Sequence, residues 1–366
     1  MKKFAYNRVL NSAVLFLLIL SASACNTQKP ATGNEDEIFV IADTADYYEM
    51  EGTLLQVFGK VIYTPQPENL FELKRKRFDD LESIKKRKNI IILSTLESNS
   101  ELGEYVKNRL DSTVNSMVEK NEEFVFNKYD LWARNQLVMT LVSPDLKQLN
   151  MNILREHDRL LGYFQKISNK RLFKSLYNDK YEKKEIEAKL LKNYGWMIYV
   201  QADFQLAKDV PEDNFVWLRR AINTDMERWI FIHWIDNATP VYLNSDSIAS
   251  VRNRQTEKFY RTSDEKAYVE IADSYRSTTE VNFNGKYALM TQGLWRFNDK
   301  SGGGPFVSYT FYDEATKRIY FIDGSIYAPK YYKKKIIQQV DVILQSFMTE
   351  AQVNPEKRED LLDLID

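Results

Sequence analysis

Cysteine is almost missing from this sequence, because Cys25 is the only one among 366 residues. A single thiol cannot form an internal disulfide, and it cannot supply the several thiolates of a structural zinc or iron–sulfur site. Histidine is nearly as scarce, with only His157 and His233. Catalytic zinc needs about three protein ligands around an open position, and no His-Glu-x-x-His motif occurs. The sequence therefore predicts neither a metal site nor a bound cofactor.

Other motifs of catalysis are missing as well. There is no Gly-x-Ser-x-Gly elbow, and the Ser-x-x-Lys match at residues 83–86 has no Lys-Thr-Gly partner. The acidic spacing of a calcium loop is absent. The glycine triplet at residues 302–304 is not followed by Gly-Lys-Ser or Gly-Lys-Thr, as a phosphate-binding loop would be. The known motif classes therefore offer no catalytic residues.

The chain also lacks an excess of charge of one sign, with 51 Lys and Arg against 52 Asp and Glu. This balance gives no reason to expect a nucleic-acid partner. Basic clusters at residues 74–77 and 85–88, expected on a helix, could contact anionic lipid head groups. Asp79, Asp80 and Glu82 lie between them. A solvated helix face is the preferred interpretation.

Long apolar runs are limited to the N-terminus, where residues 13–20 form a short one. It is too short for a membrane span of roughly 20 residues, and a positive start precedes it, as in a secretory signal. Ala22-Ser23-Ala24 then lead directly to Cys25. This order resembles a bacterial lipobox, although Ala22 stands where leucine is usual. The alternative is an ordinary cleaved signal with an incidental thiol.

The lipobox interpretation predicts a lipid-anchored protein. Residues 1–24 would be the signal peptide, Cys25 would carry the acyl chains, and residues 25–37 would form a flexible tether. Such acyl chains would hold the protein in the cell envelope. No dense acidic run follows Cys25, so we expect the outer membrane, facing the periplasm.

The sequence after the expected tether predicts an α+β fold with two domains. Residues 38–194 alternate apolar strands, such as 89–95, with long helices, so they predict an N-terminal α/β domain. One helix is expected to start with Ser143 as its cap, and its apolar stripe places His157 in a helix–helix contact.

Residues 195–350 predict a C-terminal α+β domain with a largely antiparallel sheet, closed by a helix over 330–348. Asn284-Gly285 lies between two alternating runs and predicts a hairpin. Residues 351–366 form a short amphipathic tail, whose apolar side needs a cover from the body or from a partner protein.

Several segments of the second half resemble an uncharacterised family of Bacteroidota envelope lipoproteins, known only as a domain of unknown function. These segments are "DNFVWLRR" (213–220), "ERWIFIHWID" (227–236), "GLWRF" (293–297) and "GPFVSYTFYDEATKRIYFIDGSIYAP" (304–329). The family pattern also includes an N-terminal lipobox. The resemblance implies a lipidated Cys25, and it implies no catalytic residue.

A possible ligand pocket is predicted around Trp217, His233, Gly303 and Gly304. Aromatic side chains can bind sugars or apolar ligands, and a glycine-rich segment could line a site. Core packing is the preferred interpretation of the strand tryptophans and of His233, and a loop between strands is preferred for the glycines. We expect a non-catalytic binding or assembly module, with an envelope protein as a possible partner. An envelope hydrolase using paired carboxylates is the alternative.

Overall fold

The computed structural model describes residues 28–220 and 225–365. Cys25 and the signal peptide lie outside the described residues. The chain divides into two compact units. Unit 1 comprises the residues up to Phe58 together with Phe71–Phe164, and unit 2 comprises Gly59–Leu70 together with the residues from Gln165 onward. The domain boundary expected before Gly195 lies within unit 2, directly after helix α8 (Lys184–Tyr194).

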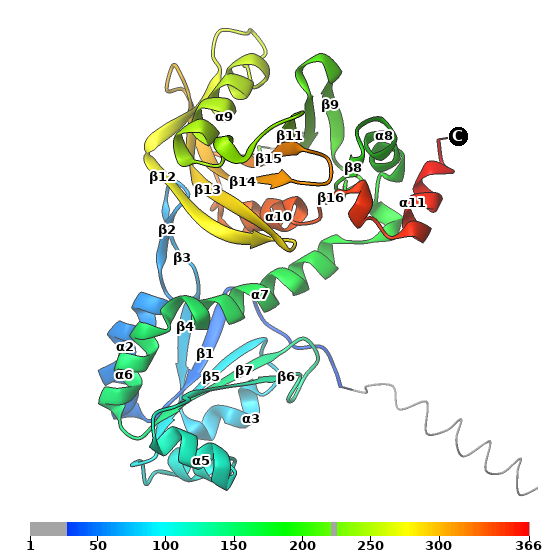
Figure 1. Ribbon diagram of the computed structural model, residues 1–366. Coiled ribbons are helices and arrows are strands. Elements are labelled where there is room, and N and C mark those ends of the chain that lie inside the picture. Colours follow the sequence, from blue (N-terminus) through cyan, green and yellow to red (C-terminus); the bar gives the residue numbers. More distant parts are fainter. Residues whose placement is uncertain (1–27, 221–224, 366) are drawn as a thin grey trace, which may run out of the picture. The chain divides into compact units, whose positions relative to one another are not determined.

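Unit 1 contains a five-stranded sheet (Figure 1). Its order is β4 (Glu72–Lys76), β1 (Glu37–Ile41), β5 (Asn89–Thr95), β7 (Leu137–Ser143) and β6 (Val125–Tyr129). All neighbouring strands are parallel except β6, which is antiparallel to β7. β1 and β5 are buried at every position, which explains their continuous apolar sequences.

Helices cover both faces of this sheet. One face packs Phe39, Ile90 and Val138 against α3 (Leu81–Ile84), α4 (Glu101–Lys107) and α5 (Ser112–Glu119). The alternate strand residues, such as Val40 and Ile91, are also fully buried. On that side α6 (Leu146–Arg155) contacts β5, β7 and α2 (Thr44–Val57). The expected N-terminal α/β unit is confirmed.

Three local expectations for unit 1 were wrong. The helix that follows β7 is capped by Asp145, whose side chain accepts from the backbone N–H of Gln148, and Ser143 is the last residue of β7. The helix then breaks at Glu156, and α7 (His157–Leu176) follows. His157 lies directly at the break, with Nδ1 2.9 Å from the carbonyl oxygen of Leu154, and its side chain is 57% exposed instead of packed. The later residues of the expected stripe, such as Leu160 and Phe164, are buried as expected. Finally, residues 74–76 belong to strand β4 and not to a helix.

The expected tether is bound to unit 1 over part of its length. Pro30 and Thr32 form bridges with Arg134 and Arg87. The backbone N–H of Ala31 donates to the carbonyl of Arg134 at 2.8 Å, and that of Thr32 donates to the carbonyl of Lys86 at 2.7 Å. The backbone N–H of Arg134 also donates to the carbonyl of Lys29 at 3.0 Å, so the described part of the expected tether is held against unit 1.

Unit 2 contains a seven-stranded antiparallel sheet. Its order is β12 (Val269–Phe283), β13 (Lys286–Phe297), β14 (Gly303–Asp313), β15 (Arg318–Tyr327), β11 (Glu227–Ile235), β10 (Phe215–Arg220) and β9 (Gln205–Val210). Asn284-Gly285 forms the turn between β12 and β13 with φ values of 52° and 87°, so this predicted hairpin is confirmed. The α+β fold class is confirmed as well.

Two helices lie on opposite faces of this sheet (Figure 1). Helix α10 (Lys334–Leu344) buries Val340 and Leu344 in one face, and α9 (Ser245–Phe259) buries Ile248 and Phe259 in the other. The five tryptophans of unit 2 are buried, as expected for core packing. None of the helices in the described ranges is both long and apolar enough to cross a bilayer.

The remaining elements of unit 2 are small. Strands β2 (Val61–Tyr63) and β3 (Pro67–Asn69) form a hairpin, and β8 (Trp196–Met197) pairs with β16 (Met348–Thr349). The tail forms α11 (Pro355–Leu362). Its Leu361 packs with Leu191 of α8, so the body covers the apolar side of the tail.

Candidate functional site

An aromatic pocket of about 500 Å³ lies on the α9 face of the seven-stranded sheet. Its aromatic lining comes from Trp217 (β10), Trp229 (β11), Phe259, Tyr260, Phe297 (β13) and Tyr327 (β15). Its polar lining comes from Lys208, Arg219, Glu227, Lys258, Arg261, Thr262, Ser263 and Glu265. We call this site the aromatic pocket. Ligand sites combine apolar walls with polar groups that fix orientation, and this pocket contains both, with polar residues in the majority.

Strand alternation positions the rings. Trp217 on β10 and Trp229 on β11 both face α9, and their ring centroids are 6.4 Å apart. Tyr260 packs between them, 4.6 Å from Trp217 and 5.2 Å from Trp229. Tyr327 stacks on Trp229 at 6.2 Å with an interplanar angle of 14°. The rings thus form a rigid wall whose positions are fixed by four elements.

The glycine triplet lies behind this wall. Gly303 and Gly304 belong to strand β14, so the loop expected there was wrong. A Cβ added at Gly302 would lie 3.1 Å from the ring of Tyr327 and 3.3 Å from that of Phe297. A Cβ at Gly304 would lie 1.9 Å from the carbonyl oxygen of Ile326. The triplet therefore lets β13, β14 and β15 approach closely, and it does not line the pocket.

His233 faces α9 but is not part of the pocket lining. Its ring is 8% exposed, with Nδ1 3.0 Å from the carbonyl oxygen of Asn214 and Nε2 3.3 Å from the Gln255 amide nitrogen. Burial lowers the pKa of His233 to about 4, although the backbone hydrogen bond to Asn214 opposes the shift. This is a neutral core histidine, the preferred interpretation from sequence. Of the four predicted residues, only Trp217 lines the pocket.

The charged groups of the pocket differ in how they are paired. Glu227 accepts through Oε2 from Arg219 Nε at 3.0 Å, from Arg219 Nη2 at 2.8 Å and from Trp229 Nε1 at 2.7 Å. Lys258 donates to Asp213 at 2.6 Å. Within the described part of the chain, neither Lys208 nor Arg261 has a carboxylate partner. Arg261 instead donates to two backbone carbonyls, which order the segment after α9.

A buried polar cluster lies deeper on the same face, and sequence reasoning missed it. Arg252 of α9 donates to Asp323 of β15 at 2.6 Å and to Ser325 at 2.9 Å, and both partners of the ion pair are almost fully buried. Burial raises the pKa of Asp323 and Arg252 opposes this. Tyr260 lies between the cluster and the pocket. Burial raises the pKa of its hydroxyl, and the negative charge of Asp323 raises it further. An acid inside the apolar run "YFIDGSIY" was the signal that could have indicated it.

Glu182 and Glu187 form a close pair of buried carboxylates that bears on the hydrolase alternative. The pKa of Glu187 is raised to about 9, mainly by burial and secondly by the neighbouring Glu182. Lys357 lies 3.2 Å from Glu182 and 3.7 Å from Glu187. A pocket of about 480 Å³ adjoins this group, with Tyr177 and Lys357 in its lining. The two carboxylates do not line it and are at most 1% exposed, so they lie beneath the cleft and tie α11 to α8.

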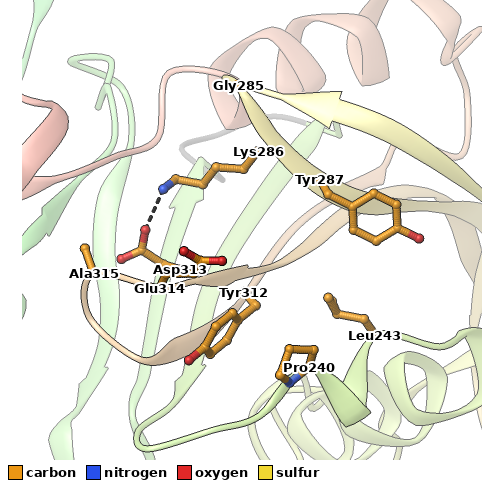
Figure 2. Close-up of a pocket in the computed structure, with 9 residues that line it drawn as sticks. All are labelled: Pro240, Leu243, Gly285, Lys286, Tyr287, Tyr312, Asp313, Glu314 and Ala315. Atoms are coloured by element: carbon orange, nitrogen blue, oxygen red, sulfur yellow. Dashed lines mark hydrogen bonds and ion pairs between the residues drawn. The ribbon is translucent and has the colours of Figure 1, made fainter.

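A larger groove of about 980 Å³ lies near the turns that follow β12 and β14. Figure 2 shows Lys286 extended toward Asp313, with Leu243 and Pro240 away from this ion pair. Burial would raise the pKa of Asp313, but hydrogen bonds from Lys286 and Thr316 outweigh it and lower the pKa. These groups already satisfy one another, so the groove offers a ligand fewer free polar atoms than the aromatic pocket.

The carboxyl ends of β1 and β5 in unit 1 are the position where open α/β sheets usually bind ligands. Asp43 follows β1 there, and Ser98 and Ser100 follow β5. The hydroxyl of Ser100 donates to Asp43 at 2.6 Å and accepts from the backbone of Gly103 at 3.0 Å. These side chains are used in turn and helix-cap hydrogen bonds. No group of three or more potential metal ligands occurs in residues 28–220 or 225–365.

The comparisons with known proteins assign no activity. Residues 183–346 match the model of DUF4837 and residues 31–177 match that of DUF8532, both domains of unknown function. No curated protein matches the chain. Two solved structures of Mog1 are 11% identical to it with TM-scores of 0.28: a mutant, and the Ran-binding protein Mog1p of Saccharomyces cerevisiae. They cover 42% and 43% of this chain and 90% of their own. A domain of unknown function was expected from the sequence, and the two family matches confirm this expectation.

Proposed function

We propose that this protein is a lipid-anchored, non-catalytic binding module of a bacterial cell envelope, and that the aromatic pocket holds its ligand. The single observation that supports binding is the composition of this pocket. Rigid rings such as Trp217 and Trp229 form its wall, while Lys208 and Arg261 remain available to a ligand. Such a wall binds with little loss of side-chain entropy, because its rings are already held in place.

The proposed anchor rests on the sequence around Cys25. Small residues precede this cysteine, and a short apolar run precedes them. Lys29 already contacts unit 1, because its carbonyl accepts from the backbone N–H of Arg134, so the proposed lipid would be attached only a few residues before the folded body. Acylation at Cys25 would place the pocket at the periplasmic surface of the outer membrane of a Bacteroidota cell.

Mass spectrometry of the intact native protein tests the anchor. The expected mass is that of a chain beginning at Cys25 plus a diacylglycerol and an amide-linked acyl chain such as palmitate. The variant Cys25→Ser should lose this added mass and leave the membrane fraction. A native chain that begins at another residue, or whose sulfur is unmodified, would contradict the anchor.

Native mass spectrometry of the full chain tests the pocket. The protein purified from its own envelope is expected to carry an additional small-molecule mass. Ser263→Trp should abolish that mass, because Ser263 is an exposed lining residue and a tryptophan there would fill the pocket. Ser250→Trp, at an exposed position of α9 outside the lining, is the matched control. A bound mass that persists in Ser263→Trp would refute the proposal.

The hydrolase alternative would have to use Glu182 and Glu187. Their burial beneath Tyr177 and Lys357 keeps both carboxylates away from a bound substrate. Their proton can stabilise the packing of α11, because a protonated Glu187 removes the repulsion between two buried acids. A structural role is therefore the better supported function of this pair.

A further inference from the structure

We propose that the ligand of the aromatic pocket is an acidic saccharide, that is, a pyranose ring carrying a carboxylate or a phosphate. This inference rests on the proposed binding function and names the class of molecule bound. Three features of the pocket support it: the flat rings, the hydrogen-bonding pair Arg219–Glu227, and the two cations without a carboxylate partner.

Among the lining rings, Phe297 and Tyr327 are partly exposed and suit the apolar face of a sugar. Trp217 and Trp229 are 8% and 7% exposed and support them from the core. Trp229 stacks nearly parallel to Tyr327, and Trp217 stands almost perpendicular to Trp229 at 89°. The face of an aromatic ring carries partial negative charge, so it attracts the positively polarised C–H groups of a pyranose. Because the rings are held by strands β10, β11 and β15, the surface is formed before the ligand arrives.

The pair Arg219–Glu227 suits sugar hydroxyl groups, each of which both donates and accepts. Glu227 uses only Oε2 in its three hydrogen bonds, and Oε1 has no partner among the described residues. Arg219 is 41% exposed and its guanidinium lies 5.6 Å from the Trp217 ring centroid. One carboxylate oxygen and one planar donor therefore face the pocket together, which matches two neighbouring hydroxyls on one ring.

The remaining charges favour an anionic substituent. Asp213 neutralises Lys258, and Glu227 neutralises Arg219. Among the lining residues that the structure describes, this leaves Lys208 and Arg261 as unpaired cations and Glu265 as the unpaired acid. An excess of positive charge at a partly water-excluded site raises the affinity for an anion. A carboxylate and a phosphate would both satisfy this requirement.

Fluorescence titration of the full chain tests the class of ligand. The protein is kept in a polyoxyethylene detergent, since a glucoside detergent would compete. The probes are glucuronic acid, glucose 6-phosphate and glucose, which share one ring and differ in charge. We expect both anionic probes to bind about tenfold more tightly than glucose, and the tighter of the two identifies the acidic group.

Two sets of variants locate the effect. The double variant Lys208→Gln, Arg261→Gln should reduce binding of the anionic probes about tenfold and leave glucose unchanged. The matched control is Lys174→Gln with Arg254→Gln, which removes two exposed charges of unit 2 outside the pocket. Tyr327→Leu should weaken all three probes, whereas Tyr327→Phe keeps the ring and should preserve binding.

Each other outcome overturns the inference in a recognisable way. Equal affinity for glucose and the anionic probes would contradict an acidic ligand. Failure of all three probes, with a native mass that is still lost in Ser263→Trp, would mean that the pocket binds a different class of molecule. Unchanged binding in the Lys208→Gln, Arg261→Gln variant would show that the anion is held elsewhere.

Discussion

The two faces of the seven-stranded sheet differ in composition. The face toward α10 buries Val216, Ile230 and Ile322 beneath Val340 and Leu344, together with aromatic rings such as Tyr309 and Phe311. Its buried carboxylate, Asp341, accepts a hydrogen bond from the Tyr309 hydroxyl. The face toward α9 is aromatic, and it also contains the buried Arg252–Asp323 ion pair, His233 and the aromatic pocket. Both faces thus bury aromatic rings and a carboxylate, and they differ because, in the described part of the chain, only the α9 face contains a buried ion pair and the aromatic pocket.

This difference separates stability from recognition. The α10 face packs aliphatic and aromatic side chains together beneath the helix. On the α9 face the rings and the polar side chains of the segment after α9 line a pocket. Substitutions on the α10 face should therefore change folding alone, and those on the α9 face should change folding and binding.

The largest effect is expected for Asp323→Ala on the α9 face. This variant leaves the Arg252 guanidinium buried without its carboxylate, at a cost of about 3–5 kcal/mol in the free energy of unfolding. Urea unfolding followed by tryptophan fluorescence measures it, because five of the six tryptophans lie in unit 2.

Two further variants show whether the unpaired charge is the cause. Arg252→Met combined with Asp323→Leu should recover most of the lost stability, since no buried charge remains. Asp225→Ala breaks an exposed ion pair with Lys330, and it should cost less than about 1 kcal/mol. Equal losses for Asp323→Ala and Asp225→Ala would remove the distinction between the two faces.

Leu344→Ala tests the α10 face. Leu344 is fully buried, and its truncation should cost about 2–5 kcal/mol through lost burial and the cavity left behind. Ligand binding, measured below the unfolding transition, should be unchanged. A loss of binding without a loss of stability would contradict the division between the faces.

His233 makes the stability of the α9 face depend on pH. Its pKa is about 4 in the folded chain against an ordinary value of 6.5, so between these values only the unfolded chain binds the proton. The free energy of unfolding should therefore fall as pH decreases from 6.5 to 4, by on the order of 3 kcal/mol, and the contribution is complete above pH 6.5. His233→Gln should lack this decrease in urea unfolding at pH 4, 5, 6 and 7. An identical pH profile in the variant would argue against a buried neutral ring.

Two glycine substitutions test how tightly each face of the sheet is packed at its closest contact. Gly304→Ala would place a Cβ 1.9 Å from the backbone carbonyl of Ile326, whereas Gly324→Ala would meet a methyl of Val340 at 2.2 Å. A side chain can move more easily than strand backbone, so both should cost about 1–3 kcal/mol with Gly304→Ala the larger. Thermal unfolding of the two variants measures which one loses more stability. A larger loss for Gly324→Ala would show that α10 moves less easily than the strand backbone.

The sequence predicted those features that depend on neighbouring residues. A continuous apolar run identified β5, and Asn284-Gly285 identified a hairpin. It failed at His157, because α6 ends at Arg155 and His157 is the first residue of α7, so its side chain lies at a break between two helices. The same spacing correctly predicted the burial of Leu160 and Phe164 beyond the break.

The site was less predictable because it depends on distant pairs. Arg252 and Asp323 are 71 positions apart, and only the register of β15 against β11 and β14 brings that acid beneath α9. Trp217 was identified by its residue type. Lys208 and Arg261 carried no comparable signal, since exposed cations occur throughout the chain. Composition therefore indicated one wall of the pocket, and tertiary contacts determined the rest.

Amide hydrogen exchange of the full chain, with and without saturating glucuronic acid, is the most direct test of the aromatic pocket as the ligand site. Exchange should slow in β10, in β11 and in residues 260–268, and it should be unchanged in α10 and in unit 1. Protection centred on α10 or on the groove of Figure 2 would contradict the assignment of recognition to the α9 face, and no protection anywhere would contradict an acidic saccharide as the ligand.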